Sequence, residues 1–169
     1  EGRNKSEYYA GSTARIYRQA IDDYYLDPEN WSPKSYLKEL NATSNRGYTL
    51  AFHDGRLTNL AHDYDSTRSS AIFEYAGQVV DIEDENLVIL VKNRLAKGDV
   101  LEFLVPKSKE VILLRIYEFK LAKNDKIVDV VHAGQKEKIK VPLNLFHLHD
   151  LEKLKQKIPP LTLIRKEKP

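Results

Sequence analysis

The chain has 169 residues, 41% hydrophobic and 31% charged, which is long enough to bury one core. It has no cysteine, which excludes disulfides, thiolate nucleophiles, zinc fingers and cysteine-bound iron–sulfur clusters within this chain. The net charge is only +2, yet residues 136–169 carry nine Lys/Arg against four Asp/Glu, and the first 135 residues carry 18 against 21. A basic final quarter suits an anionic partner, although a solvated surface is the simpler interpretation.

The first forty residues have helical periodicity. Apolar side chains recur three and four apart and predict one stripe on a helix, formed by Tyr9, Ile16, Tyr17, Ala20, Ile21, Tyr24 and Tyr25. Pro28 ends this helix, because the residue before a proline avoids the helical region. Ser32 as N-cap and Pro33 as first helical residue then predict a second helix to about Leu40. So small a helical hairpin must pack on something else to bury its apolar stripe.

From Asn45 onward the pattern changes to short β-strands separated by turn residues. The expected strands span residues 47–52, 71–82, 87–91, 100–105, 111–121, 127–131, 136–141 and 161–164. The run 87–91 is apolar throughout, as in a strand that is buried on both faces. Residues 151–156 are the one stretch among the later strands that could form a helix. Strands at this spacing predict an antiparallel barrel or sandwich.

No set of residues with a catalytic or metal-binding pattern stands out. His147 and His149, beside Asp150, would share one face of a strand, but no third ligand follows at a diagnostic spacing, so a polar loop is favoured. The pairs at 53–54 and 62–63, each His-Asp, lie near turns and are interpreted as incidental. The sequence lacks a G-x-S-x-G motif and a glycine-rich phosphate loop. We therefore predict neither catalytic residues nor a metal site.

Basic residues provide the more informative pattern. Lys136, Lys138 and Lys140 alternate with other residues, so on a strand all three would lie on one face and attract phosphates in a salt-dependent manner. The alternative is that lysines on an edge strand prevent aggregation between sheets. The triplet at 92–94, Lys-Asn-Arg, follows an apolar run and could form a ligand-binding edge. We favour the simpler interpretation that a barrel strand emerges into water there.

Several motifs in order resemble the C-terminal region of the peptidase U32 (collagenase-like) family. The segment Ala14–Asp22 followed by Tyr24 resembles the helix after the family's catalytic barrel, and Glu1-Gly2-Arg3 matches the stretch at that junction. The segments 46–49, 77–79, 91–94, 98–99, 101–102, 133–135 and 163–165 resemble further family motifs. Asn45 stands where the family usually has His, which weakens any role for that side chain.

This resemblance implies a fold and a set of partners. Family members have an N-terminal TIM-barrel-like domain, so residues 1–44 would be a helical linker from that missing domain and residues 45–169 a C-terminal domain. That domain is similar to the small closed β-barrel that forms the second domain of translation elongation factors. Members are known as peptidases or collagenases, and several bacterial members hydroxylate bases in tRNA or ribosomal RNA. For those members the resemblance implies conserved cysteines that hold an iron–sulfur cluster. Since this chain has no cysteine, we expect no cofactor within it.

We therefore expect a mainly β fold, a small closed antiparallel barrel preceded by a helical hairpin, that binds or positions a substrate without catalysing a reaction. The substrate would be RNA or, alternatively, the protein substrate of a genuine protease. The expected substrate-binding residues are Arg46, Tyr48, Lys92, Asn93, Arg94, Lys136, Lys138 and Lys140. We expect cytoplasmic localisation, with secretion of the parent left open, and no membrane partner. An exposed stripe of Tyr9, Tyr17 and Tyr24 would cause self-association or poor order of the N-terminus.

Overall fold

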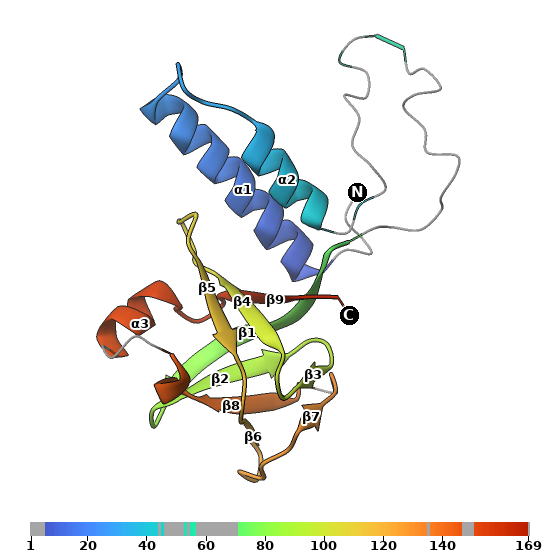
Figure 1. Cartoon of the computed structure of the whole chain (residues 1–169), viewed down its shortest axis with the longest axis vertical. Helices are drawn as coiled ribbons and strands as arrows, with labels where there is room; N and C mark the ends of the chain where they lie inside the picture. Colours follow the sequence, from blue (N-terminus) through green and yellow to red (C-terminus); the bar gives the residue numbers. More distant parts are fainter. Residues whose placement is uncertain are drawn as a thin grey trace.

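The computed structural model describes residues 6–43, 45, 53, 55–56, 71–134, 136–146 and 151–168. Two parts are evident in Figure 1: a pair of helices lies beside a β-domain formed by the described residues from 71 onward. The predicted strand at 47–52, the expected site residues Arg46 and Tyr48, and the His147–Asp150 cluster lie outside the described residues.

The predicted helical hairpin is confirmed. Helix α1 spans Glu7–Leu26 and helix α2 spans Lys34–Ala42. Helix α1 ends at Leu26, and the backbone N–H of Asp27 donates to the Asp23 carbonyl at 3.0 Å. The assigned N-cap lies one residue after the predicted one, because α2 begins at Lys34 with Pro33 before it, yet Ser32 Oγ still accepts a long hydrogen bond from the Lys34 backbone N–H at 3.5 Å. The Pro33 carbonyl accepts the first helical hydrogen bond, from the Leu37 N–H at 2.9 Å.

The β-domain is built on one antiparallel sheet in the order β5-β4-β9-β1-β2-β8-β6. Its strands are β1 (Phe73–Glu83), β2 (Asn86–Val91), β4 (Val100–Leu104), β5 (Val111–Arg115), β6 (Lys120–Leu121), β8 (Lys138–Pro142) and β9 (Leu163–Glu167). A separate pair joins β3 (Leu95–Ala96) to β7 (Val130–Val131). A 3-10 turn η2 (Leu143–Leu145) and helix α3 (Leu151–Lys157) precede β9. The domain is therefore mainly β, as predicted.

One hydrophobic core lies within the β-domain. Its fully buried side chains come from strands, connections and the α3 region alike, and include Ile89, Leu101, Phe103, Ile116, Phe119, Ile139, Leu154, Ile158 and Ile164. Strand β2 has both faces covered, since Leu87, Val88 and Ile89 are consecutive and all buried. This confirms the interpretation of the unbroken apolar run as a strand buried on both sides.

The described strands do not form the predicted closed barrel. The sheet keeps two edges, β5 and β6, because the run expected as one strand over residues 111–121 is interrupted between them. At the interruption Ile116 and Phe119 enter the core, and the Ile116 carbonyl accepts the N–H of Gly98 at 2.7 Å. At Ile116 the chain therefore pairs with the segment before β4. A closed barrel would have required one continuous strand at this point. The expected strand over 127–131 is likewise reduced to the two residues of β7.

Candidate nucleic-acid interface

Lysines gather at the β6–β8 edge of the sheet. Strand β6, the turn after it, the turn before β8 and β8 itself together contribute Lys120, Lys123, Lys126, Lys136, Lys138 and Lys140, which we call the lysine edge. Four of them, Lys123, Lys136, Lys138 and Lys140, line a shallow hollow of about 480 Å³ together with Glu83 and Glu137. The structure thus brings together the three lysines predicted as one face and adds a fourth.

Strand register explains this clustering. Lys120 and Lys140 lie directly opposite each other on β6 and β8, an arrangement of like charges that destabilises a strand pair unless an anion compensates it. Asp125 provides that anion, because its carboxylate accepts a hydrogen bond from Lys140 Nζ at 3.0 Å. This hydrogen bond raises the pKa of Lys140 and keeps its ammonium group charged.

The acidic partners at the lysine edge are fewer than the lysines. Besides the Lys140–Asp125 pair, Lys123 Nζ lies 3.1 Å from Glu137 Oε2. Neither Lys136 nor Lys138 forms an ion pair with any residue that the structure describes, and both are exposed. Among the four lysines that line the hollow, two free ammonium groups beside two paired ones can hold phosphate oxygens by charge, with no requirement for a particular base.

The triplet at 92–94 is engaged mainly in structural contacts. The backbone N–H groups of Lys92 and Asn93 both donate to the Ala76 carbonyl, at 3.0 and 3.3 Å. The Asn93 side chain donates to Glu74 Oε2 at 3.0 Å, and Lys92 Nζ lies 3.2 Å from Glu7 Oε1 at the start of α1. Arg94 alone is exposed. These contacts fit the favoured interpretation of an emerging strand.

The triplet nevertheless adjoins the lysine edge through the backbone. The N–H of Val91, the residue just before the triplet, donates to the Glu137 carbonyl at 2.9 Å. Of the predicted substrate-binding residues that the structure describes, Lys136, Lys138 and Arg94 keep charged groups that form no ion pair with a described residue, whereas Lys140 is paired with Asp125. Lys92 and Asn93 are already committed to other side chains.

Two basic residues near the C-terminus belong to buried ion pairs, which the sequence pattern did not reveal. The Arg165 guanidinium donates to Glu102 at 2.8 Å and to Glu39 of α2 at 2.9 Å, and it lies 3.9 Å from the centre of the Phe73 ring. Lys166 Nζ lies 2.8 Å from Asp99 and 3.4 Å from Glu74. These two charges join α2 and the strands and are unavailable to phosphate.

The electrostatics of Arg165 favour its charged form. Burial opposes a charge there, but hydrogen bonds to Glu39 and Glu102 outweigh it and raise the pKa of the guanidinium. Only 4% of the Arg165 side chain is exposed, against 39% of Glu39 and 17% of Glu102. The charge is therefore a structural clamp rather than a ligand-binding group.

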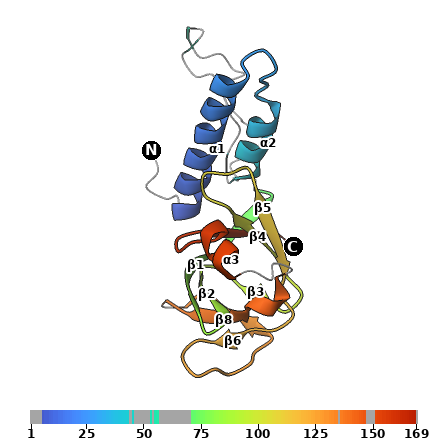
Figure 2. The ribbon, with the colours of Figure 1, turned by 90° about the vertical axis from the view of Figure 1, so that its left-hand side faces the viewer.

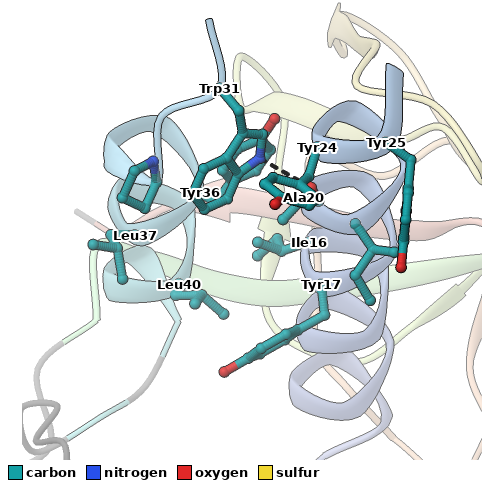
Figure 3. Close-up of a pocket in the computed structure, with 11 residues that line it drawn as sticks. Ile16, Tyr17, Ala20, Tyr24, Tyr25, Trp31, Tyr36, Leu37 and Leu40 are labelled. Atoms are coloured by element: carbon teal, nitrogen blue, oxygen red, sulfur yellow. Dashed lines mark hydrogen bonds between the residues drawn. The ribbon is translucent and has the colours of Figure 1, made fainter. Parts of the chain in front are cut away.

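An apolar groove of about 570 Å³ lies along the helical hairpin and is lined by residues of both helices (Figure 3). Side chains of both helices line it, among them Tyr17, Tyr24, Tyr36 and Leu37, together with Trp31 from the connection between the helices. The Trp31 indole N–H donates to the Ala20 carbonyl at 3.0 Å, and its ring stacks on Tyr36. The predicted apolar stripe thus exists on α1, although Tyr9 is half-buried and the adjacent Tyr8, absent from the predicted stripe, is buried against Tyr75.

Neither a metal site nor a membrane-spanning helix is found among the described residues. In that part of the chain, no group of three or more His, Cys, Asp or Glu side chains is arranged to hold a metal ion. In the same ranges, no helix has the length and apolar character needed to cross a bilayer.

Comparisons with known proteins show the family of the chain. The profile of the peptidase family U32 C-terminal domain matches residues 73–165, and that of peptidase family U32 matches residues 1–63. The chain is therefore a member of peptidase family U32. Among solved structures, the chain matches the one titled as the C-terminal domain of Geobacillus thermoleovorans putative U32 peptidase, with 20% identity, a TM-score of 0.41 and coverage of 55% of this chain and 99% of that one.

The curated relatives are longer proteins. The chain is 30% identical over 163 residues to tRNA hydroxylation protein P of Helicobacter pylori, a match that covers 86% of this chain and 37% of that protein. It is 34% identical over 114 residues to tRNA hydroxylation protein P of Escherichia coli, covering 64% of this chain and 24% of that protein. The chain thus spans between about a quarter and somewhat over a third of these relatives.

Proposed function

We propose that this chain is the C-terminal part of a larger U32 protein that modifies tRNA, and that its β-domain positions the RNA without taking part in the chemistry. The names of the relatives support tRNA as the substrate of the parent. The single observation that supports a contact by this domain is the lysine edge, where Lys136 and Lys138 have no acidic partner among the described residues.

The positioning role follows from the kind of groups present. Lysines bind the RNA backbone by charge and fix its register, whereas chemistry on a base requires a nucleophile, a general base and an orienting group held together. The hollow at the lysine edge offers four ammonium groups and two carboxylates on an open surface, which suits backbone contact. The reaction itself would take place in the remaining part of the parent.

The test is a titration of the full 169-residue chain with labelled total tRNA at 50 and 200 mM salt. If three lysines each contact a phosphate, affinity should fall about 20- to 40-fold between these salt concentrations. The variant Lys136→Glu/Lys138→Glu/Lys140→Glu should bind at least about tenfold more weakly at 50 mM salt and show a slope of log K against log salt that is smaller by about 2 to 3.

A matched control separates a local contact from a general loss of positive charge. The variant Lys34→Glu/Lys38→Glu/Lys168→Glu changes the net charge equally at three exposed lysines away from the β6–β8 edge, and it should retain wild-type affinity. Equal weakening by both variants, or binding unaffected by salt, would contradict the proposal. Binding of denatured collagen in place of tRNA would support the alternative, a protein-substrate docking domain.

A further inference from the structure

Helix α1 has two chemically different faces. Arg15, Gln19 and Asp23 lie four residues apart and therefore share one face, which contacts the loop between β4 and β5 (Figure 2). Arg15 donates to the Val105 carbonyl at 3.2 Å and to the Glu110 carbonyl at 3.1 Å, Gln19 donates to the Ser108 carbonyl, and Asp23 pairs with Lys109. This polar face attaches the hairpin to the β-domain.

The other face of the helix is apolar, and no described residue outside the hairpin covers it. Tyr17 and Ile21 lie two residues from Arg15 and Gln19, so they point about 200° away around the helix axis. Together with α2 they form the groove of Figure 3, whose lining residues include no charged side chain. Six large apolar side chains on or beside the groove remain between 43% and 84% exposed: Tyr17, Ile21, Tyr24, Tyr25, Leu26 and Leu37.

The exposed area is large enough for a stable interface. Taking about 200 Å² for a fully exposed large side chain, these six present on the order of 700 Å² of apolar surface. A standard interface buries about 800 Å² on each partner. Absence of charge from the groove argues against nucleic acid as its occupant, because nucleic-acid affinity depends on neutralising phosphates.

The family matches indicate what covers this face. The hairpin falls within residues 1–63, matched by the profile of peptidase family U32, whereas the C-terminal-domain profile begins at residue 73. The relatives that match here extend far beyond the aligned part. We infer that an apolar surface from the rest of the parent's U32 region binds in the α1–α2 groove. This inference rests on the proposed function, because it takes this chain as part of a larger protein.

The hairpin is then an adaptor with one polar and one apolar contact face. Its polar face and the Arg165–Glu39 pair hold it on the β-domain, and its apolar face holds it on the remaining U32 region. The lysine edge consequently keeps a set orientation relative to that region, which a flexible tether would not provide.

Hydroxyl-radical footprinting tests this inference, with oxidation of single tyrosines quantified by mass spectrometry. The 169-residue chain and the full-length parent are compared at the same concentration, without RNA. Tyr17 and Tyr25, which are 58% and 79% exposed in the chain, should oxidise at least fivefold more slowly in the parent. Tyr117 is the matched control, since it lies in the β-domain, is 57% exposed and should oxidise equally in both proteins.

Each other outcome overturns the inference. Equal oxidation of Tyr17 in chain and parent would leave the groove uncovered. Protection that appears only in the isolated chain and increases with its concentration would assign the groove to a second copy, and protection only after addition of tRNA would assign it to RNA. A natural polypeptide of 169 residues would overturn this inference and the proposed function together. A lysine-edge variant that binds tRNA normally would contradict only the proposed function.

Discussion

Arg165 offers the sharpest test of how the hairpin and the β-domain are held together. Its guanidinium joins Glu39 on α2 to Glu102 on β4 and lies against Phe73, with 4% of the side chain exposed. The substitution Arg165→Met keeps an unbranched stem of similar length against Phe73 and leaves the β9 ladder intact. It removes only the charge and its hydrogen bonds.

The expected loss follows from the surroundings of the two carboxylates. Removal of one partner from a buried ion pair costs about 3–5 kcal/mol, since the other charge remains buried and unpaired. Glu102, with 17% exposure, meets that condition, whereas Glu39, with 39% exposure, can regain water. We therefore expect the free energy of unfolding to fall by about 3 kcal/mol, near the lower end of that range.

Urea unfolding at pH 7, followed by circular dichroism, measures this loss. The double variant Arg165→Met/Glu102→Leu should recover at least about 1 kcal/mol, because it no longer buries an unpaired charge. Lys168→Met, at an exposed position of the same chain end, should change stability by no more than about 0.5 kcal/mol. A loss below about 1 kcal/mol for Arg165→Met, or no recovery in the double variant, would refute the clamp.

Two further predictions concern the close packing of the β-domain and its behaviour at high pH. A Cβ on Gly77 would lie 2.7 Å from the Leu90 carbonyl oxygen, so Gly77→Ala should lower the urea midpoint and destabilise the protein by about 1–3 kcal/mol. Gly134→Ala, with its nearest neighbour atom at 3.9 Å, is the control that should leave the midpoint almost unchanged. Burial raises the pKa of Tyr75 from 10.0 to about 12, so folding favours the protonated phenol; the resulting stability is complete below pH 10 and is lost as the pH rises towards 12. Tyr75→Phe should lose less stability than wild type between pH 9 and 11, and equal urea midpoint shifts in the two proteins would contradict this.

Local patterns predicted the element types well where one residue repeat matched one environment. The helical stripe of α1 and the unbroken apolar run of β2 each have a period that a single kind of structure satisfies. The alternation of Lys138 and Lys140 likewise places both on one face of β8, because a strand repeats every two residues. Local spacing could not show that Asp125 compensates Lys140, since that contact spans 15 residues.

Burial within an element was less predictable than its type. The stripe on α1 included Tyr9, yet Tyr8 is the buried side chain, because it stacks on Tyr75 of β1 with ring centres 5.6 Å apart. Both tyrosines suit an amphipathic helix, and only the position of the sheet selects between them. The run 111–121 shows the same limit of local patterns. Its β-branched and aromatic residues predict one strand, but the run is interrupted where Ile116 and Phe119 pack into the core.

The amino-acid order alone determined that this chain has a helical hairpin followed by antiparallel strands, no thiol chemistry and a lysine-rich strand near its end. Tertiary structure decided that the described strands form an open sheet and that Arg165 and Lys166 are held in internal ion pairs. It also decided that Lys136 and Lys138 stay free of ion pairs with described residues and that α1 turns its apolar face away from the β-domain. The physical reason is the distance along the sequence over which each kind of interaction acts. Periodicity acts between residues a few positions apart, whereas the burial and pairing of a charge depend on partners such as Glu39, which is 126 residues from Arg165.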